Sequence, residues 1–354
     1  MMNILNTTAL YAHHKQLNAK MVDFAGWEMP VQYQGIIQEH NAVRNHMGVF
    51  DVSHMARILI EGLDAEQVLD FLSTNKISGK KDGSATYTVW CHENGGCVDD
   101  LIVYRLTKDR FFVVVNASNR EKDLIHLLRH AAGKQVTITP LYGEHGILAV
   151  QGPEANTLFP FLADMKPMQV CETEFEGDPI VLATTGYTGS GGFEVYAEND
   201  AIIKLWEFLM TRGVVPAGLG ARDTLRLEMG FALYGHELAD DVKPTETVSK
   251  WTVKINKDDF LGKESLDNFQ DLRSQFGVLL TEKGIAREGT EVFYQGEKIG
   301  TVTSGTFSPT LQQGIAIVMA DRLLDPDQDV ELLVRQRRLK GKVVKMPFID
   351  MGET

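Results

Sequence analysis

The apolar positions in the first two-thirds of the chain follow two periods. Apolar side chains recur three or four residues apart from Ile36 to Met47 and again over 68–72, which predicts a helix at each place. Runs rich in β-branched and aromatic residues follow at 86–91, 100–106 and 110–116. The connections between these runs are too short for parallel crossovers, so the pattern predicts an antiparallel meander flanked by helices.

The same mixture continues to about residue 230. A helix is expected at 119–130, with Leu124, Leu127 and Leu128 on its apolar face. Further strands are expected at 147–151, 180–184 and 193–197, and further helices at 199–212 and 218–229. The fold class of this part is therefore α+β.

The C-terminal part of the chain has a different pattern. Short strands separated by Gly-, Asp- and Pro-containing turns follow one another at 275–280, 291–296, 298–305, 314–320, 329–334 and 340–345. This pattern predicts an all-β domain, either a small barrel or a jelly roll. The stretch ADDVKPT at 239–245 is the best candidate for the linker that precedes it.

Length and composition narrow the class of protein. A chain of 354 residues is longer than one core usually supports, so two or three domains are expected. The 48 acidic against 35 basic residues give a net charge of −13, which argues against broad binding to nucleic acid or to an anionic membrane.

Three cysteines without a CxxC pair favour a reducing compartment, and no apolar run reaches the roughly 20 residues of a membrane span. Since the N-terminus lacks a signal pattern, a cytoplasmic location is expected.

Several common kinds of site have no counterpart in the sequence. The glycine-rich stretch 186–194 lacks the GK[ST] of a P-loop, and 218–223 lacks the third glycine of a dinucleotide fingerprint. Histidines and cysteines do not have metal-ligand spacing, and there is no GxSxG elbow. We therefore expect no metal and no nucleotide cofactor of these classes.

A Gly-Gly turn within 93–104 brings two adjacent aspartates to the start of an apolar strand. Adjacent residues of a strand point to opposite faces, so only one of Asp99 and Asp100 can face a given pocket. If Val89 pairs with Asp100 across the hairpin, Tyr87 lies on the same face as Asp100. The alternative is that both aspartates cap the hairpin, as Asp often does in turns.

Two further clusters have the chemistry of a ligand site. In 185–194, glycines allow close approach of the backbone, and Glu194 could accept two hydrogen bonds from a guanidine-like edge, as in a pterin or guanine. In 216–228, Arg222 near a helix start could bind an anion or hold Glu194. The alternatives are a tight hairpin with a solvated Glu194, and a helix face whose own ion pairs hold Arg222 and Arg226.

A basic segment lies near the C-terminus. It contains six cations, which are Arg335, Arg337, Arg338, Lys340, Lys342 and Lys345. These residues could dock an acidic partner, or they could protect the edge strand of a sheet from pairing with other chains.

Long blocks spread over most of the chain resemble those of one family. They are KMVDFAGWEMPVQY (20–33), AVRNHMGVFDVSHM (42–55), GGCVDDLIVY (95–104), VVNASNREKD (114–123), QGP (151–153), TGYTGSGGFE (185–194), PAGLGARDTLRLE (216–228), LYGHEL (233–238) and TSGTFSPTL (303–311). From about Leu10 to Ile349 the chain is similar to the aminomethyltransferase (T-protein) family of the glycine cleavage system. So many blocks in one order are far more specific than any single motif.

The resemblance implies a fold of two discontinuous antiparallel α+β folate-binding domains and a C-terminal β-barrel or jelly-roll-like domain around a central channel. The implied domains are 1–55 with 140–245, 56–139 with the paired aspartates, and 246–354. The resemblance also implies tetrahydrofolate as co-substrate and the lipoylated H-protein as partner. The H-protein would carry an aminomethyl group on its lipoyl sulfur, and the one-carbon unit would pass to folate N5 as ammonia leaves.

By motif match, the family's roles fall on eight residues of this chain. The resemblance implies Asp100 as the catalytic residue, Glu194 as the carboxylate that holds the pterin, and Arg222 as the arginine of the folate pocket. The positions that line the channel are Tyr87, Asn116, Tyr187, Met55 and Trp251. Departures from the family pattern occur at Ala56, Thr184, Ser190, Phe231 and within 244–251.

Other functions of the same superfamily stay open at this point. A folate-dependent demethylase would differ in channel details, whereas the flavin-dependent oxidising enzymes need a GxGxxG domain for which the chain has no room. A folate-binding iron–sulfur assembly factor is recognised by a Lys-Gly-Cys-Tyr-x-Gly-Gln block. The corresponding region here reads GHELADDVKPTE and has no cysteine.

Overall fold

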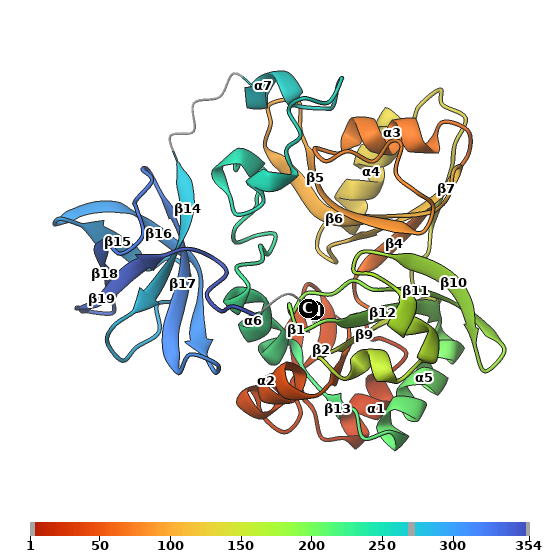
Figure 1. The fold of residues 1–354 in the computed structure, drawn as a ribbon, viewed down its shortest axis with the longest axis horizontal. Coiled ribbons are helices and arrows are strands. Elements are labelled where there is room, and N and C mark those ends of the chain that lie inside the picture. The colour runs from red at the N-terminus through yellow and green to blue at the C-terminus, as the bar shows by residue number, and fades with distance from the viewer. Residues whose placement is uncertain (1–3, 268–272, 352–354) are drawn as a thin grey trace.

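The structure, a computed structural model, describes residues 4–267 and 273–351. Figure 1 shows two α+β bodies packed against each other and a β-barrel beside them. Within the described ranges, no helix is long and apolar enough to cross a membrane.

A six-stranded sheet forms the first body, in the order β10-β11-β12-β9-β3-β13. Its strands are β3 (Gly48–Asp51), β9 (His145–Gln151), β10 (Val170–Phe175), β11 (Asp178–Ala183), β12 (Gly192–Glu198) and β13 (Val215–Pro216). The pairs are antiparallel except for β3 with β13. Helix α5 (Asn199–Thr211) covers one face and buries an apolar stripe that includes Leu205 and Trp206.

Five shorter elements complete this body. They are α1 (Tyr11–Gln16), the hairpin of β1 (Lys20–Phe24) and β2 (Trp27–Gln32), α2 (Ile36–Asn45) and α6 (Leu219–Glu228). Helix α6 contacts α2 and β2 on one side and strands of the barrel on the other, so it lies at the junction of two bodies (Figure 1).

A five-stranded antiparallel sheet forms the second body, in the order β5-β6-β7-β4-β8. Its strands are β4 (Ala56–Glu61), β5 (Ser84–Cys91), β6 (Cys97–Thr107), β7 (Arg110–Val115) and β8 (Thr137–Pro140). Helices α3 (Ala65–Leu72) and α4 (Arg120–His130) pack on its outer face. The meander predicted over 86–116 is therefore confirmed as β5, β6 and β7.

The predicted apolar face of α4 is partly wrong. Its buried stripe runs through Asp123, Leu127 and the following Ala131, whereas Leu128 is 50% exposed. Residues four apart share a helix face, and Leu128 lies about 100° around the helix from Leu127. A buried aspartate, Asp123, thus lies on the buried stripe, where the prediction had placed only leucines at 124, 127 and 128.

The third body is a closed barrel in the order β14-β17-β16-β15-β18-β19, as predicted. Its strands are β14 (Ser274–Leu280), β15 (Glu291–Tyr294), β16 (Glu297–Ser308), β17 (Gln313–Ala320), β18 (Asp329–Val334) and β19 (Arg337–Val344), and the short α7 (Lys263–Asp267) precedes them. Strand β19 pairs with both β14 and β18. The basic segment is therefore not the free edge of a sheet, and that interpretation of its charges is wrong.

The two sheets share a core, which sets the position of the site. Tyr104 and Phe112 from the five-stranded sheet pack with Phe50, Ala149 and Tyr196 from the six-stranded sheet. The barrel is held to α6 by buried polar contacts as well as apolar ones. Ser308 Oγ donates to Glu228 Oε1 over 2.5 Å, and Arg226 Nη2 donates to Ser304 Oγ over 2.8 Å.

The segment 239–245, predicted to be a linker, is docked on the hairpin of β5 and β6. The backbone N–H of Cys97 donates to the carbonyls of Ala239 (3.2 Å) and Val242 (2.9 Å), which fixes this stretch against the second body. We propose the domain division 1–55 with 140–245, 56–139, and 246–354, and the membership of the three sheets supports it.

Candidate functional site

The hairpin of β5 and β6 places the two adjacent aspartates on opposite faces of the sheet. Val89 pairs with Asp100, as expected from the sequence. The turn needs glycine because Gly95 has φ +84°, and a Cβ on Gly96 would lie 1.9 Å from the carbonyl oxygen of Asp240.

Asp100 is held at both carboxylate oxygens. The hydroxyl of Tyr87 donates to Oδ2 over 2.9 Å, and Asn116 Nδ2 donates to Oδ1 over 3.0 Å. The side chain is partly accessible, although protein atoms surround most of it. This burial, together with the negative charge of Asp99, raises the pKa of Asp100 to about 7. A carboxyl group with such a pKa can take up and release a proton near neutral pH.

Asp99 is fully buried on the other face. It accepts hydrogen bonds from the backbone N–H of Asn116 (3.0 Å), from Asn116 Nδ2 (2.8 Å) and from Asn119 Nδ2 (2.6 Å). Both carboxylates therefore bind residues beyond the end of β7 rather than the turn of their own hairpin. The interpretation that both aspartates cap the hairpin is wrong.

Glu194, on β12, is buried, so the alternative of a solvated side chain is also wrong. Its Oε2 accepts hydrogen bonds from Thr185 Oγ1 (2.5 Å) and Tyr196 OH (2.9 Å), and a longer one from Tyr104 OH (3.4 Å). Within the described residues, Oε1 has no donor. The carboxylate is thus fixed in orientation by hydroxyls at one oxygen, and its other oxygen can accept from a ligand.

The two arginines of α6 differ in their partners. Arg226 forms an ion pair with Asp223 of its own helix (2.8 Å), as the interpretation of a self-paired helix face expected, and a second one with Glu237 outside the helix (2.9 Å). Arg222 instead places its guanidinium 4.7 Å from the centre of the Tyr187 ring, and its buried Nη1 has no acceptor in the described part of the chain. Burial lowers the pKa of Arg222, against the opposing influence of Glu194, so the two charges act on each other. Arg222 therefore has a donor available for an anionic or carbonyl group.

The remaining predicted residues lie around these three. The Trp251 ring is 57% exposed and stacks on Tyr87, with ring centres 5.7 Å apart. Met55 packs against the core shared by the two sheets, and Tyr187 donates to the carbonyl of Ala232. Most of the eight predicted residues are neither buried nor fully exposed, namely Met55, Tyr87, Asp100, Asn116, Tyr187 and Arg222. Polar and aromatic side chains with this partial access are suited to the wall of a ligand space.

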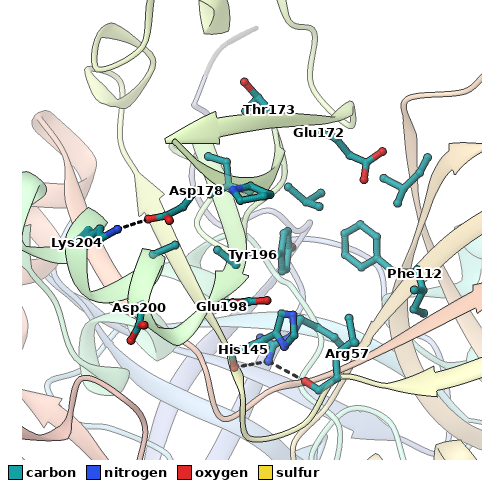
Figure 2. Close-up of a pocket in the computed structure, with 18 of the residues that line it drawn as sticks. Arg57, Phe112, His145, Glu172, Thr173, Asp178, Tyr196, Glu198, Asp200 and Lys204 are labelled. Carbon is teal, nitrogen blue, oxygen red and sulfur yellow. Dashed lines mark hydrogen bonds and ion pairs between the residues drawn. The ribbon is translucent and has the colours of Figure 1, made fainter. Parts of the chain in front are cut away.

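A separate cavity of about 670 Å³ is bounded by strands of both sheets and by α5 (Figure 2). Its lining does not include Asp100, Glu194 or Arg222, although it includes Tyr196, whose hydroxyl reaches Glu194. Two ion pairs lie along this cavity, between Lys204 and Asp178 (2.6 Å) and between Arg110 and Glu172 (2.6 Å), and Arg57 Nε and Nη1 have no partner among the described residues. The three central residues of the predicted site lie outside its lining. We therefore do not assign the predicted site to it.

Several residues of the site were missed from the sequence. Tyr104 shares the face of β6 with Asp100, and Tyr196 shares the face of β12 with Glu194, so strand alternation could have identified both. Ser249 Oγ lies 3.1 Å from the Tyr87 hydroxyl, but it comes from a loop whose path no local pattern predicts. Among residues 4–267 and 273–351, no group of three or more His, Cys, Asp or Glu side chains could hold a metal ion.

Comparison with known proteins identifies the family. Residues 10–257 match the family model described as the GCVT N-terminal domain, and residues 273–350 match the glycine cleavage T-protein C-terminal barrel domain. The chain belongs to the glycine cleavage T-protein family. It is 43% identical to the aminomethyltransferase of Thermosipho melanesiensis, over 96% of each chain. It is 46% identical to that of Rubrobacter xylanophilus, over 97% of this chain and 94% of the relative.

A solved T-protein structure has the same fold over the whole chain. The glycine cleavage system aminomethyltransferase T of Bartonella henselae superposes with a TM-score of 0.91 at 32% identity, covering 98% of each chain. The α+β fold with a C-terminal barrel, predicted from the sequence, is therefore confirmed. Since the curated T-protein relatives are named aminomethyltransferases, the chain is an enzyme of the one-carbon transferase type.

Three departures from the family pattern make contacts near the site. Ser190 Oγ accepts from Arg44 Nη1 over 2.8 Å, and Phe231 stacks on Tyr187 with ring centres 5.9 Å apart. Ser249 contacts the Tyr87 hydroxyl, which itself binds Asp100. Two of these three residues, Phe231 and Ser249, therefore contact predicted site residues directly.

Proposed function

We propose that this chain transfers a one-carbon unit from an aminomethyl group, carried on the lipoyl arm of an H-protein, to tetrahydrofolate, with release of ammonia. The observation that carries the proposal is the arrangement of two oriented carboxylates in one region of the molecule. The face of β6 that carries Asp100 also carries Tyr104, and the Tyr104 hydroxyl reaches Glu194. Such a pair suits a ligand with a guanidine-like edge at one end and a reacting nitrogen at the other.

The residues present fit tetrahydrofolate as a co-substrate. Glu194 Oε1 would accept from the pterin edge, Arg222 Nη1 would donate to a carbonyl or carboxylate, and Tyr87, Asn116, Tyr187, Met55 and Trp251 would line the space around it. When bound, tetrahydrofolate would supply the nitrogen that accepts the one-carbon unit. The chain itself would orient the co-substrate and limit the access of water to it.

Asp100 is proposed as the catalytic residue. Positive charge develops when the carbon–nitrogen bond of the aminomethyl group breaks, and a fixed carboxylate nearby stabilises it. Because the Asp100 pKa lies at about 7, the same group can also take a proton near neutral pH. Tyr87 and Asn116 keep both carboxylate oxygens in place during this step.

The basic segment 335–345 is proposed as part of the surface that docks the H-protein. All six of its cations are exposed. In a chain with a net charge of −13, such a local positive surface would attract an acidic face of a carrier protein and raise the association rate. A cytoplasmic location is also proposed, because three cysteines without a CxxC pair favour a reducing compartment.

A reconstituted assay tests the proposed function. Purified protein is mixed with H-protein that carries the aminomethyl group, and ammonia release is followed with and without tetrahydrofolate. We expect release only when both are present. Release without tetrahydrofolate, or none with it, would exclude the proposal. Turnover of a methylated sulfonium compound instead would favour the folate-dependent demethylase.

A further inference from the structure

Behind the proposed catalytic aspartate, two further aspartates, Asp99 and Asp123, are buried inside the second body. Asp99 is fully buried and receives three amide hydrogen bonds from Asn116 and Asn119. Asp123, also fully buried, lies on α4 one turn after Asn119, whose side-chain amide binds Asp99, and the charge of Asp99 acts on its carboxyl group. Among the described residues, no N–H or O–H group donates to either carboxyl oxygen of Asp123.

Two buried carboxyl groups that act on each other, one of them without a donor among the described residues, are stabilised by sharing a proton. If both were ionised, two negative charges would face each other in a buried place, at a high cost in free energy. If Asp123 holds the proton, its O–H donates to Asp99, and the pair carries a single negative charge. Burial and the charge of Asp99 raise the pKa of Asp123 to about 11, so it keeps this proton at neutral pH.

Asn116 connects this pair to Asp100. Its single Nδ2 atom donates to Asp99 Oδ1 (2.8 Å), to Asp100 Oδ1 (3.0 Å) and to the backbone carbonyl of Asp100 (3.1 Å). Asp99 thus fixes the position of the Asn116 amide, and the same amide donates a hydrogen bond to Asp100. Burial first, and the charge of Asp99 second, raise the pKa of Asp100.

Other charged or titratable groups that face the three aspartates come from several elements. They are Tyr87 on β5, Cys97 on β6, Lys122 on α4, Tyr142 before β9, Tyr187 before β12 and Tyr234 after α6. Lys122 is the cation of this set, and its Nζ already pairs with Asp240 at 3.1 Å. Burial raises the pKa of each of these tyrosines and of Cys97, so they stay neutral over the pH range of activity. The charge next to Asp100 that a mutation can remove is therefore that of Asp99.

We propose that Asp99 and Asp123 form a proton-sharing carboxyl pair that positions Asn116 and sets the pH at which Asp100 ionises. Both are positioning residues in this account, since they act through Asn116 and through charge rather than by touching the substrate. The inference rests on the proposed role of Asp100 for its functional meaning. The pair itself is tested by measurements that need no activity.

The first measurement is infrared difference spectroscopy of the carboxyl groups. At about pH 9, the wild-type protein should show the C=O stretch of one buried protonated carboxylic acid that Asp123→Asn lacks. Asp164→Asn, at an exposed position, is the matched control and should leave this band unchanged. If the spectra of wild type and Asp123→Asn are the same in this region, no proton is shared and the inference is overturned.

The second measurement is the midpoint of Asp100 titration, assigned by its loss in Asp100→Asn. In Asp99→Asn the midpoint should move to lower pH by about one unit or more, because a neighbouring negative charge is removed. The acid limb of kcat should move with it, so the variant keeps more of its maximal rate at about pH 6 than the wild type does. Structural damage alone would lower the rate at every pH without moving the limb.

The outcomes separate this inference from the proposed function. A midpoint that stays in place in folded Asp99→Asn overturns the tuning role, even if Asp100 is catalytic. A midpoint that moves while Asp100→Asn retains full activity supports the pair and contradicts the catalytic role of Asp100. If Asp99→Asn does not fold, the infrared band of Asp123 still decides whether the proton is shared.

Discussion

The hydroxyl of Tyr87 donates a hydrogen bond of 2.9 Å to Oδ2 of Asp100, and the two residues lie on the same face of neighbouring strands. Asn116 binds the other carboxylate oxygen, so Asp100 has one donor at each oxygen. A carboxylate held in this way has little freedom to rotate, and this orientation is what an electrostatic role in a transition state requires.

Tyr87→Phe removes the donor and keeps the ring that stacks on Trp251. A hydrogen bond to a charged group contributes about 1.5–3 kcal/mol, so kcat should fall roughly ten- to a hundredfold. The acid limb of the pH profile should move to higher pH, because the lost bond stabilised the ionised form of Asp100. Tyr142→Phe is the matched control, since the Tyr142 hydroxyl donates to the carbonyl of Arg120. An unchanged kcat in Tyr87→Phe would show that this bond has no catalytic importance.

The activity of the wild-type protein should depend on pH through Asp100. Because the pKa of Asp100 is about 7, the carboxylate gains a proton and loses its charge as the pH falls through neutrality. If the ionised form is required, kcat should fall about tenfold per pH unit below the midpoint. Steady-state kinetics between about pH 5.5 and 9 check this. A constant kcat down to about pH 5.5 would contradict the need for ionised Asp100.

Glu194→Gln should weaken tetrahydrofolate binding. An amide presents one acceptor and one unwanted donor to the pterin edge, and losing a charged hydrogen bond costs about 1.5–3 kcal/mol, or roughly ten- to a hundredfold in affinity. Glu198→Gln, at the exposed end of the same strand, is the control. Isothermal titration calorimetry that gives wild-type affinity for Glu194→Gln would mean that Glu194 only supports the hydroxyls of Thr185, Tyr196 and Tyr104.

Reversing charges in the basic segment should weaken the interaction with the H-protein and leave tetrahydrofolate binding unchanged. Arg338 already pairs with Glu331 at 2.8 Å, so Arg337→Glu should have the larger effect of the two single reversals. The double variant should raise the KM for H-protein, more at low than at high salt, and leave the Kd for tetrahydrofolate unchanged. A double reversal of the exposed Lys108 and Lys134, in the second body, controls for net charge. If the KM for H-protein is the same in all variants across the salt range, the segment 335–345 does not dock the H-protein.

Most helices and most strands could be predicted from the sequence because their hydrophobic periods are clear, but the strands β1, β2, β3, β4, β8, β10 and β13 were not predicted. Strand alternation also separated Asp99 from Asp100 and placed Tyr87 beside Asp100 correctly. Strand alternation does not predict which helix residues pack behind the sheet, because the buried face of a helix depends on tertiary packing. Asp123 therefore went unnoticed, and Leu128 was assigned to a buried face although it is half exposed.

Residues brought in by long connections were the least predictable part of the site. Ser249 contacts Tyr87 from a loop more than a hundred residues away along the chain, and the segment 239–245 seemed a linker because of its composition. That segment packs on the hairpin through the backbone of Cys97, a contact between distant segments that composition cannot reveal. The roles of Asp100, Glu194 and Arg222 came from motif resemblance, and their hydrogen-bond partners came from the structure.

The most direct test of the account is Asp100→Asn, measured at about pH 8 beside Asp99→Asn. The asparagine fits the site, since Tyr87 can accept from its amide and donate to Ser249 instead. Folding should not suffer, and Tm should rise by roughly a few degrees, because a carboxylate with a raised pKa costs stability once it is ionised.

We expect kcat of Asp100→Asn to fall by about 10²–10⁴, while calorimetry shows tetrahydrofolate still bound through Glu194. At this pH the loss in Asp99→Asn should be much smaller, since its side chain points away from the site. Near-normal turnover by folded Asp100→Asn would contradict the catalytic assignment.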